Sequence, residues 1–230
     1  MKKFKFIVFM MCLVFSNLHA QNNGPTLEDY FTSVTPEAAS PDAEGFIRRW
    51  LLLEPIDKPN RTNIVFTDSY LREAFNTEYF KGQFTTFPKD GQKVKVGKQK
   101  LAWHALDSKL FNVKLFRFAS GLKKQIYGVL FWAVTVIECN EDIPNVRLAV
   151  GSNSGSMWWL NGEEAVILSG DRRMVKDDCT SPRLTLKKGR NILRGAVING
   201  PGMSDFCVRF IDEKGQPVNN ISITTTQPKK

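Results

Sequence analysis

The side chains best suited to chemistry in this sequence are aromatic rings and planar polar groups. Trp158 and Trp159 are consecutive in a segment of extended character, so their side chains point to opposite faces of a strand. An exposed tryptophan ring can stack on the C–H groups of a sugar, while arginine and amide groups hydrogen-bond its hydroxyls. This pattern predicts a carbohydrate-binding site. Its predicted residues are Trp158, Trp159, Trp103, Asp171, Arg172 and Arg173.

Each part of this predicted site has a structural alternative. A partner strand or the N-terminal segment could cover the tryptophan ring that points outward. The three charged residues 171–173 follow a predicted strand, and loops at the edge of a β-sandwich often carry recognition. Arginines are also commonly solvated without a binding role. The alternative for these residues is therefore a solvated basic loop that binds nothing.

Hydrolytic chemistry has weaker support than binding. Beyond residue 20 the chain has one histidine, His104, and it has no G-x-S-x-G motif. A triad of a serine, His104 and Asp107 is an alternative, but a hydrogen-bonding His104 beside Trp103 is favoured. The pairs Glu163-Glu164 and Asp177-Asp178 are adjacent in sequence, so their side chains diverge and they are interpreted as solvated charges. No catalytic residue is therefore assigned.

The sequence predicts no cofactor and leaves a structural calcium ion open. Asn140-Glu141-Asp142 follows a strand end and offers oxygen ligands, but no spaced calcium-loop motif is present. Beyond residue 20 the cysteines are Cys139, Cys179 and Cys207, with no C-x-x-C spacing. Free thiols are favoured over one disulfide, and Cys207 is predicted to be a core residue.

The N-terminus predicts export. Lys2, Lys3 and Lys5 precede an apolar run over 6–15, and Ala20 offers a cleavage site. The run is too short for the roughly 20 residues of a membrane span. We therefore expect a signal peptide over 1–20, an extended leader over 21–45, a single domain over 46–230, and a periplasmic or extracellular location.

The charge balance argues against nucleic-acid binding. Lys and Arg total 32 against 23 Asp and Glu, a net charge of +9. These basic residues are scattered, with no arginine-rich run or aromatic-basic motif. A basic exported protein could instead favour acidic glycans or the cell surface.

The pattern of apolar residues predicts an all-β fold with minor helical segments. Short extended runs alternate with turn signals, which is typical of a β-sandwich. The run 126–139 predicts a strand buried on both faces. Helical spacing appears over 67–82, with Asp68 as a cap, and a hairpin turn is predicted at 89–92. The other predicted strands lie within 46–54, 94–96, 146–150, 156–160, 165–168, 183–186, 192–198, 206–211 and 221–223.

Residues 148–166 and 184–210 resemble a known family. Leu148-Ala149-Val150-Gly151-Ser152 followed by Trp158-Trp159-Leu160-Asn161-Gly162 is similar to the strand–hairpin unit of galactose-binding-like jelly rolls. Such domains are attached to family 2 glycoside hydrolases and polysaccharide esterases. The turn Lys187-Lys188-Gly189-Arg190-Asn191 and the closing strands fit the same pattern, and the resemblance covers about residues 126–223.

The resemblance implies a jelly-roll β-sandwich that binds a polysaccharide or oligosaccharide, alone or beside a glycan-degrading enzyme. We therefore expect a non-catalytic carbohydrate-binding module. The sequence is also similar to small exported chains labelled acetylxylan esterase, so a small carbohydrate esterase is one alternative. A structural or docking subunit of an extracytoplasmic complex is the other.

Overall fold

The computed structural model describes residues 25–227 of the 230-residue chain. The predicted signal peptide, with Cys12 inside it, lies outside the described residues. Within residues 25–227 no helix is long and apolar enough to cross a membrane.

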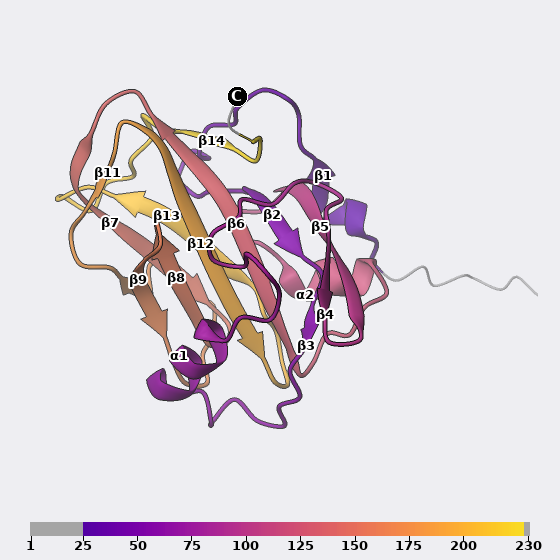
Figure 1. Cartoon of the computed structure of the whole chain (residues 1–230). Coiled ribbons are helices and arrows are strands. Elements are labelled where there is room, and N and C mark those ends of the chain that lie inside the picture. Colours follow the sequence, from indigo (N-terminus) through magenta and orange to yellow (C-terminus); the bar gives the residue numbers. More distant parts are fainter. Residues whose placement is uncertain (1–24, 228–230) are drawn as a thin grey trace, which may run out of the picture.

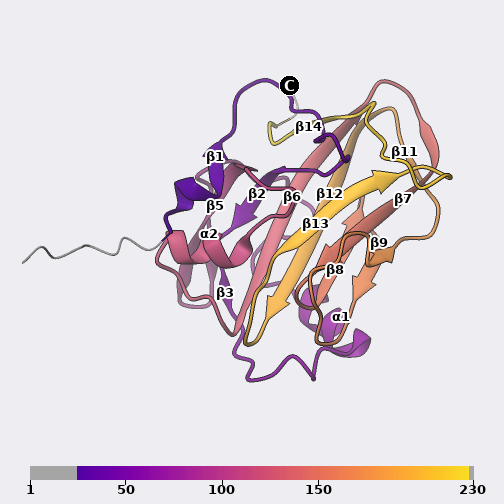
Figure 2. The same ribbon diagram turned by 180° about the vertical axis from the view of Figure 1, so that it is seen from behind.

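Two antiparallel sheets make up most of the structure, together with two short α-helices (Figures 1 and 2). The larger sheet has the strand order β1-β5-β2-β6-β12-β8-β9, with β3 and β14 also pairing β6 and β4 pairing β5. Its strands are β1 (Phe31–Ser33), β2 (Arg49–Leu53), β3 (Ile56–Asp57), β4 (Lys93–Val96), β5 (Gln99–Ser108), β6 (Val129–Cys139), β8 (Ser156–Leu160), β9 (Glu163–Leu168), β12 (Gly189–Asn199) and β14 (Ser222–Thr224). The smaller sheet contains β7 (Ile143–Ser152), β10 (Cys179–Thr180), β11 (Leu184–Leu186) and β13 (Phe206–Ile211).

The mostly β prediction is confirmed, and the longest strand pair lies at the middle of the larger sheet. β6 and β12 are antiparallel from Gly189 opposite Cys139 to Asn199 opposite Val129. Ten of the eleven residues of β6 are buried, as expected for a strand covered on both faces. The apolar run 126–139 therefore predicted this strand correctly.

Each face of the larger sheet packs against a separate hydrophobic cluster. The sandwich core fills the space between the two sheets and includes Trp50, Phe131, Trp158 and Phe206. The second cluster lies on the opposite face of the larger sheet and includes Trp132, Trp159 and Phe75. Because side chains alternate along a strand, consecutive residues of β6, β8 and β12 belong to different clusters.

Residues 58–92, here called the outer cap, cover the second cluster. They contain α1 (Asp68–Asn76), which lies against β8 in front of the larger sheet in Figure 1. Leu71, Ala74 and Phe75 form the buried face of this helix. The predicted cap residue Asp68 is wrong by one position, because the Thr67 hydroxyl accepts the Tyr70 N–H at 3.3 Å.

Two further segments differ from the sequence-based expectations. Residues 89–92 form the predicted turn, with the Gln92 N–H donating to the Lys89 carbonyl at 3.0 Å. The hairpin itself lies later in the chain, since β4 and β5 are joined at Gly97–Lys98, with Val96 opposite Gln99. The segment predicted as an extended leader packs onto the sandwich. It contributes β1 to the edge beside β5, after a short 3₁₀ turn, η1 (Leu27–Asp29). The second helix, α2 (Leu115–Gly121), packs against the sandwich core through Leu115 and Phe118.

Candidate functional site

A pocket of about 240 Å³ lies where the outer cap meets β8 and β12. Asn76 at the end of α1, Phe84 of the cap and Gly162 after β8 form part of its lining, together with Trp159 and Arg194. β8 and β12 pair in the register that places Arg194 directly opposite Trp159. Opposed residues of an antiparallel pair share a face, so both side chains leave the sheet on the side of the cap.

The aromatic side of the pocket is rigidly packed. The Trp159 ring stacks on Trp132, with centroids 5.6 Å apart and an interplanar angle of 22°. Phe75 meets Trp159 edge-on at 6.5 Å, and Phe84 meets Trp132 edge-on at 5.8 Å. Trp159 is 7% exposed, so only a small part of its ring remains for contact with a ligand.

Arg194 is the polar residue that distinguishes this pocket. Its side chain is buried, at 5% exposure, and among the described residues its hydrogen-bond partner is the Thr86 carbonyl, 3.3 Å from Nη2. Nε has no partner there. Burial lowers the pKa of Arg194, because a cation loses hydration in a low-dielectric site. The guanidinium is thus a buried group with unused donors.

The β8–β9 turn fixes the rim of the pocket. Asn161 and Gly162 adopt φ values of +54° and +92°, which confirms the type I′ pattern expected for Asn-Gly. Asn161 Oδ1 accepts the Ile192 N–H at 2.8 Å, and its Nδ2 donates to Asn191 Oδ1 at 3.0 Å. These bonds attach the turn to β12, the strand that carries Arg194.

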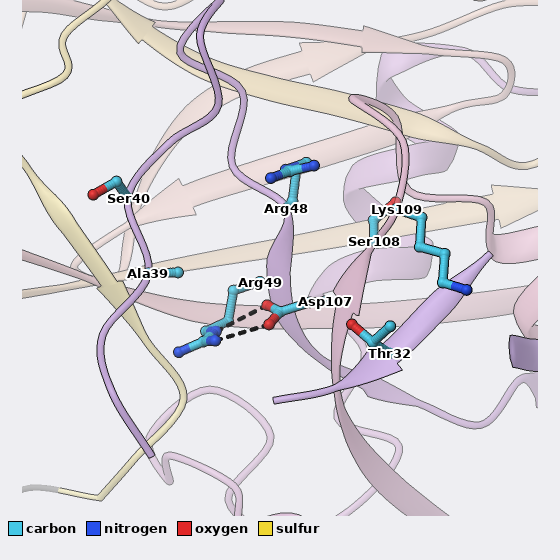
Figure 3. Close-up of a pocket in the computed structure, with 8 residues that line it drawn as sticks. All are labelled: Thr32, Ala39, Ser40, Arg48, Arg49, Asp107, Ser108 and Lys109. Carbon is cyan, nitrogen blue, oxygen red and sulfur yellow. Dashed lines mark hydrogen bonds and ion pairs between the residues drawn. The ribbon is translucent and has the colours of Figure 1, made fainter. Parts of the chain in front are cut away.

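A larger hollow of about 370 Å³ lies at the β1–β5–β2 edge (Figure 3). Its central pair is Arg49 and Asp107, joined by two 2.8 Å hydrogen bonds, from Nε to Oδ1 and from Nη2 to Oδ2. The hydrogen bonds from Arg49 to Asp107 raise the pKa of Arg49 despite its burial. Arg49 Nη1 also donates to the carbonyls of Thr35 and Glu37. Its charge is already satisfied, so we interpret it as an attachment of the N-terminal segment to β2.

The structure separates the three predicted tryptophans. Trp158 is fully buried in the sandwich core, with its ring 5.9 Å from Trp50 and 4.9 Å from Phe206. Trp103 is also buried, on β5, four strands from β8 and thus about 19 Å away. The expectation that either Trp158 or Trp159 has an exposed ring is therefore not met, because the second sheet covers Trp158 and the outer cap covers Trp159. Trp159 alone of the three lines the pocket.

The predicted loop residues lie at the far end of β9 from the pocket. Asp171 Oδ1 accepts Asn63 Nδ2 at 3.0 Å, which joins this loop to the outer cap. Arg172 turns back to the Ser169 carbonyl, at 2.9 Å, and forms an ion pair with Asp178. Arg173 is exposed. β9 is six residues long, about 20 Å, so this loop does not join Trp159 in one site.

The predicted alternative triad is not assembled around His104. His104 Nε2 lies 3.3 Å from Glu54 Oε1, and Lys124 Nζ lies 3.0 Å from the other oxygen of Glu54. Burial opposes ionisation of Glu54, but hydrogen bonds from Lys124, the Ala102 N–H and His104 together lower its pKa. Asp107 points to the opposite face of β5, toward Arg49. In residues 25–227 no serine hydroxyl hydrogen-bonds to His104.

The acidic turn considered for calcium serves as a backbone cap. Asp142 accepts the Lys188 N–H at 2.7 Å and Lys187 Nζ at 3.3 Å. The described part of the chain holds no cluster of three or more His, Cys, Asp or Glu side chains that could bind a metal ion.

Cys139, Cys179 and Cys207 are unpaired, and the core prediction for Cys207 is confirmed by its 1% exposure.

The sequence analysis missed the residues that complete the pocket around Trp159. A usable signal was Arg194 itself, a single charge inside the apolar run 192–198. A buried charge in a central strand needs a partner or a function. Asn76 and Phe84 carried no comparable signal, because their place depends on the path of the irregular outer cap.

No family model and no curated protein matches this sequence. Solved structures with partial similarity include the PA14 sugar-binding domain from an RTX adhesin, at 10% identity over 76% of this chain and 96% of that one, with a TM-score of 0.40. The PA14 domain of the MpAFP antifreeze protein gives 11% identity, 85% and 100% coverage and a TM-score of 0.39. The Kluyveromyces marxianus β-glucosidase in complex with glucose gives 18% identity and a TM-score of 0.36. The match covers 57% of this chain and 16% of that enzyme.

Proposed function

We propose that this protein is a non-catalytic carbohydrate-binding module of the galactose-binding-like class, with its ligand in the pocket of Trp159 and Arg194. The observation that carries the proposal is the cross-strand pairing of a tryptophan ring with a guanidinium whose donors are largely unused. This combination suits sugar recognition, because the ring contacts C–H groups while the donors bind ring or hydroxyl oxygens.

The size of the pocket supports a short ligand. Pockets for drug-sized molecules hold about 300–1,000 Å³, and this one holds about 240 Å³. A single sugar ring, at the end of a chain or as a side branch, fits such a space better than an internal stretch of polysaccharide. The rigid Trp132–Trp159 stack would limit the conformational entropy lost on binding.

The chemistry of the lining supports binding rather than group transfer. Among the described residues it consists of an amide, two aromatic rings, a glycine and a guanidinium. Nucleophilic catalysis requires an activated nucleophile beside a base, and glycoside hydrolysis requires two carboxyl groups across the bond. The lining offers stacking and hydrogen-bond donors instead.

The proposal includes export. The N-terminal pattern described above favours a periplasmic or extracellular protein. There it would capture a polysaccharide or oligosaccharide, alone or together with a glycan-degrading enzyme.

Affinity electrophoresis of residues 21–230 tests this proposal. The protein is run through gels that contain xylan, pectin, mannan or arabinan, beside Trp159→Phe and the matched control Trp103→Phe. We expect retardation in at least one gel, relieved by the corresponding oligosaccharide, weakened by Trp159→Phe and kept by Trp103→Phe. Free migration in all four gels, or equal retardation of both folded variants, would contradict the proposal.

A further inference from the structure

We infer that the sugar bound in this pocket is acidic, with a carboxylate held by the guanidinium of Arg194. This inference rests on the proposed function and adds the chemical class of the ligand. The described chain has two buried arginines, Arg49 and Arg194, at 4% and 5% exposure, and their surroundings differ.

Arg49 shows how this fold accommodates a buried guanidinium. It has Asp107 as counter-charge, with two parallel 2.8 Å hydrogen bonds, and backbone carbonyls for its remaining nitrogen. Arg194 is equally buried but forms no ion pair with a described carboxylate. Among the described residues it donates one hydrogen bond, from Nη2 to the Thr86 carbonyl. Burial of an unpaired charge is costly, and an oppositely charged group offsets that cost.

The unused donors match a carboxylate in number and shape. A guanidinium carries five N–H donors in a planar fork, and in the described structure one of them meets an acceptor. Planar carboxylates bind such a fork through two parallel hydrogen bonds, as Asp107 does at Arg49. Arg194 Nε is buried and has no acceptor among the described residues.

The acidic side chain directly opposite Trp159 is already engaged by another arginine. Glu164, opposite Trp159 on β9, is held by Arg72, with Nη2 and Nε at 2.7 and 3.2 Å from its oxygens. Without the three lysines of the predicted signal peptide the net charge falls from +9 to +6, which still favours the approach of an anionic glycan. An acidic residue on the ligand therefore supplies what the protein lacks.

The test compares a uronic acid with its own methyl ester. Oligosaccharides of galacturonate, glucuronate and mannuronate, each as free acid and as methyl ester, are titrated into the full chain by calorimetry. The ester keeps the ring and hydroxyls and removes the charge. We expect at least one free acid to bind about tenfold or more tightly than its ester, the effect of one charge-assisted hydrogen-bonded pair.

Substitutions test whether Arg194 causes the preference for the free acid over its methyl ester. In Arg194→Met the preference for acid over ester should disappear, while Arg194→Lys should keep part of it because the charge remains without the fork. Arg173→Met removes an exposed arginine outside the pocket and should bind as the parent does. Circular dichroism of each variant establishes that it is folded.

The outcomes separate this inference from the function on which it rests. Equal affinity for acid and ester, or an acid preference unchanged in folded Arg194→Met, would overturn the carboxylate assignment and leave sugar binding standing. Preference for a sulfated galactan over every uronate would overturn it too. If neither acid, ester nor the four neutral and acidic polysaccharides bind, the proposed function fails as well.

Discussion

Arg194 lies directly opposite Trp159 across the β8–β12 pair, and the next pair along the same two strands, Gly195 with Trp158, points the other way. One dipeptide on each strand thus contributes to both faces of the sheet. Trp158 and Gly195 complete the sandwich core, while Trp159 and Arg194 line the pocket under the outer cap. The site depends on this register, since a slip of one residue would exchange the two faces.

The absence of a side chain at Gly195 makes room for Trp158. A Cβ atom there would lie 2.3–2.6 Å from three carbons of the indole ring. Gly195→Ala should therefore lower the free energy of unfolding by about 1–3 kcal/mol, the usual cost of overpacking a core, measured by urea denaturation. Trp158→Phe in the Gly195→Ala background should recover part of the loss, because the smaller ring vacates the clash. An unchanged midpoint in Gly195→Ala would refute this account of the packing.

Arg194 and Arg49 should respond in opposite ways to the same substitution. Arg194→Met removes an unpaired buried cation, so the free energy of unfolding should stay the same or rise by about 1 kcal/mol. Arg49→Met leaves Asp107 without its partner and frees the carbonyls of Thr35 and Glu37. It should cost about 3 kcal/mol. Chemical denaturation of both variants under one set of conditions measures the difference, and equal losses would show that Arg194 is a structural residue.

Cys207 should make stability depend on alkaline pH. Burial raises the pKa of the Cys207 thiol to about 12, from an ordinary value of 9.0. Below pH 9 both the folded and the unfolded thiol keep the proton. Between about pH 9 and 12 the unfolded chain loses it first, so the thiol's contribution of about 4 kcal/mol is lost as pH rises. Cys207→Ala should flatten the decline of unfolding free energy over this range, measured by denaturation at successive pH values.

The control for that experiment is Cys179→Ala, which changes a partly exposed thiol. It should leave the alkaline slope close to that of the parent, because this thiol is less buried than that of Cys207. Equal slopes in the parent and Cys207→Ala would contradict the prediction.

Asn161 should tolerate glycine better than alanine. Its φ of +54° is in the left-handed region, and its side chain binds β12 through the Ile192 N–H. Asn161→Ala loses that bond and keeps the strain, so it should cost about 1–3 kcal/mol. Asn161→Gly loses the bond alone and should cost less, as thermal unfolding of the two variants would show. A greater loss in the glycine variant would exclude backbone strain as the reason.

The regular strands could be predicted from the sequence because their signals are local. The β-branched and aromatic run of β6, and the Asn161-Gly162 turn, are fixed by residues adjacent in the chain. The alternation that sends Trp158 and Trp159 to opposite faces is equally local. What covers each face depends on distant segments, so the burial of Trp158 under the smaller sheet could not be foreseen.

The candidate site was only partly predictable for the same reason. The prediction included Trp159 but joined it to Asp171, Arg172 and Arg173, which lie at the far end of β9. The partner that the structure provides, Arg194, is 35 residues further along the chain and is brought opposite Trp159 by strand pairing. Phe84 and Asn76 arrive through the outer cap, whose irregular part has no periodic pattern.

Because β6 and β12 are shared by both hydrophobic clusters, neither side of the larger sheet can be altered in isolation. A bulkier or smaller residue in the sandwich core should displace strands whose alternate residues line the pocket of Trp159 and Arg194. Substitutions at positions such as Gly195 should therefore change affinity without touching a sugar, with non-additive effects when combined with changes at Arg194. During evolution, the residues tolerated on one face of the larger sheet should depend on the residues present on the other face. A redesign of the pocket would therefore need to include the sandwich-core residues behind it, such as Gly195 and Trp158.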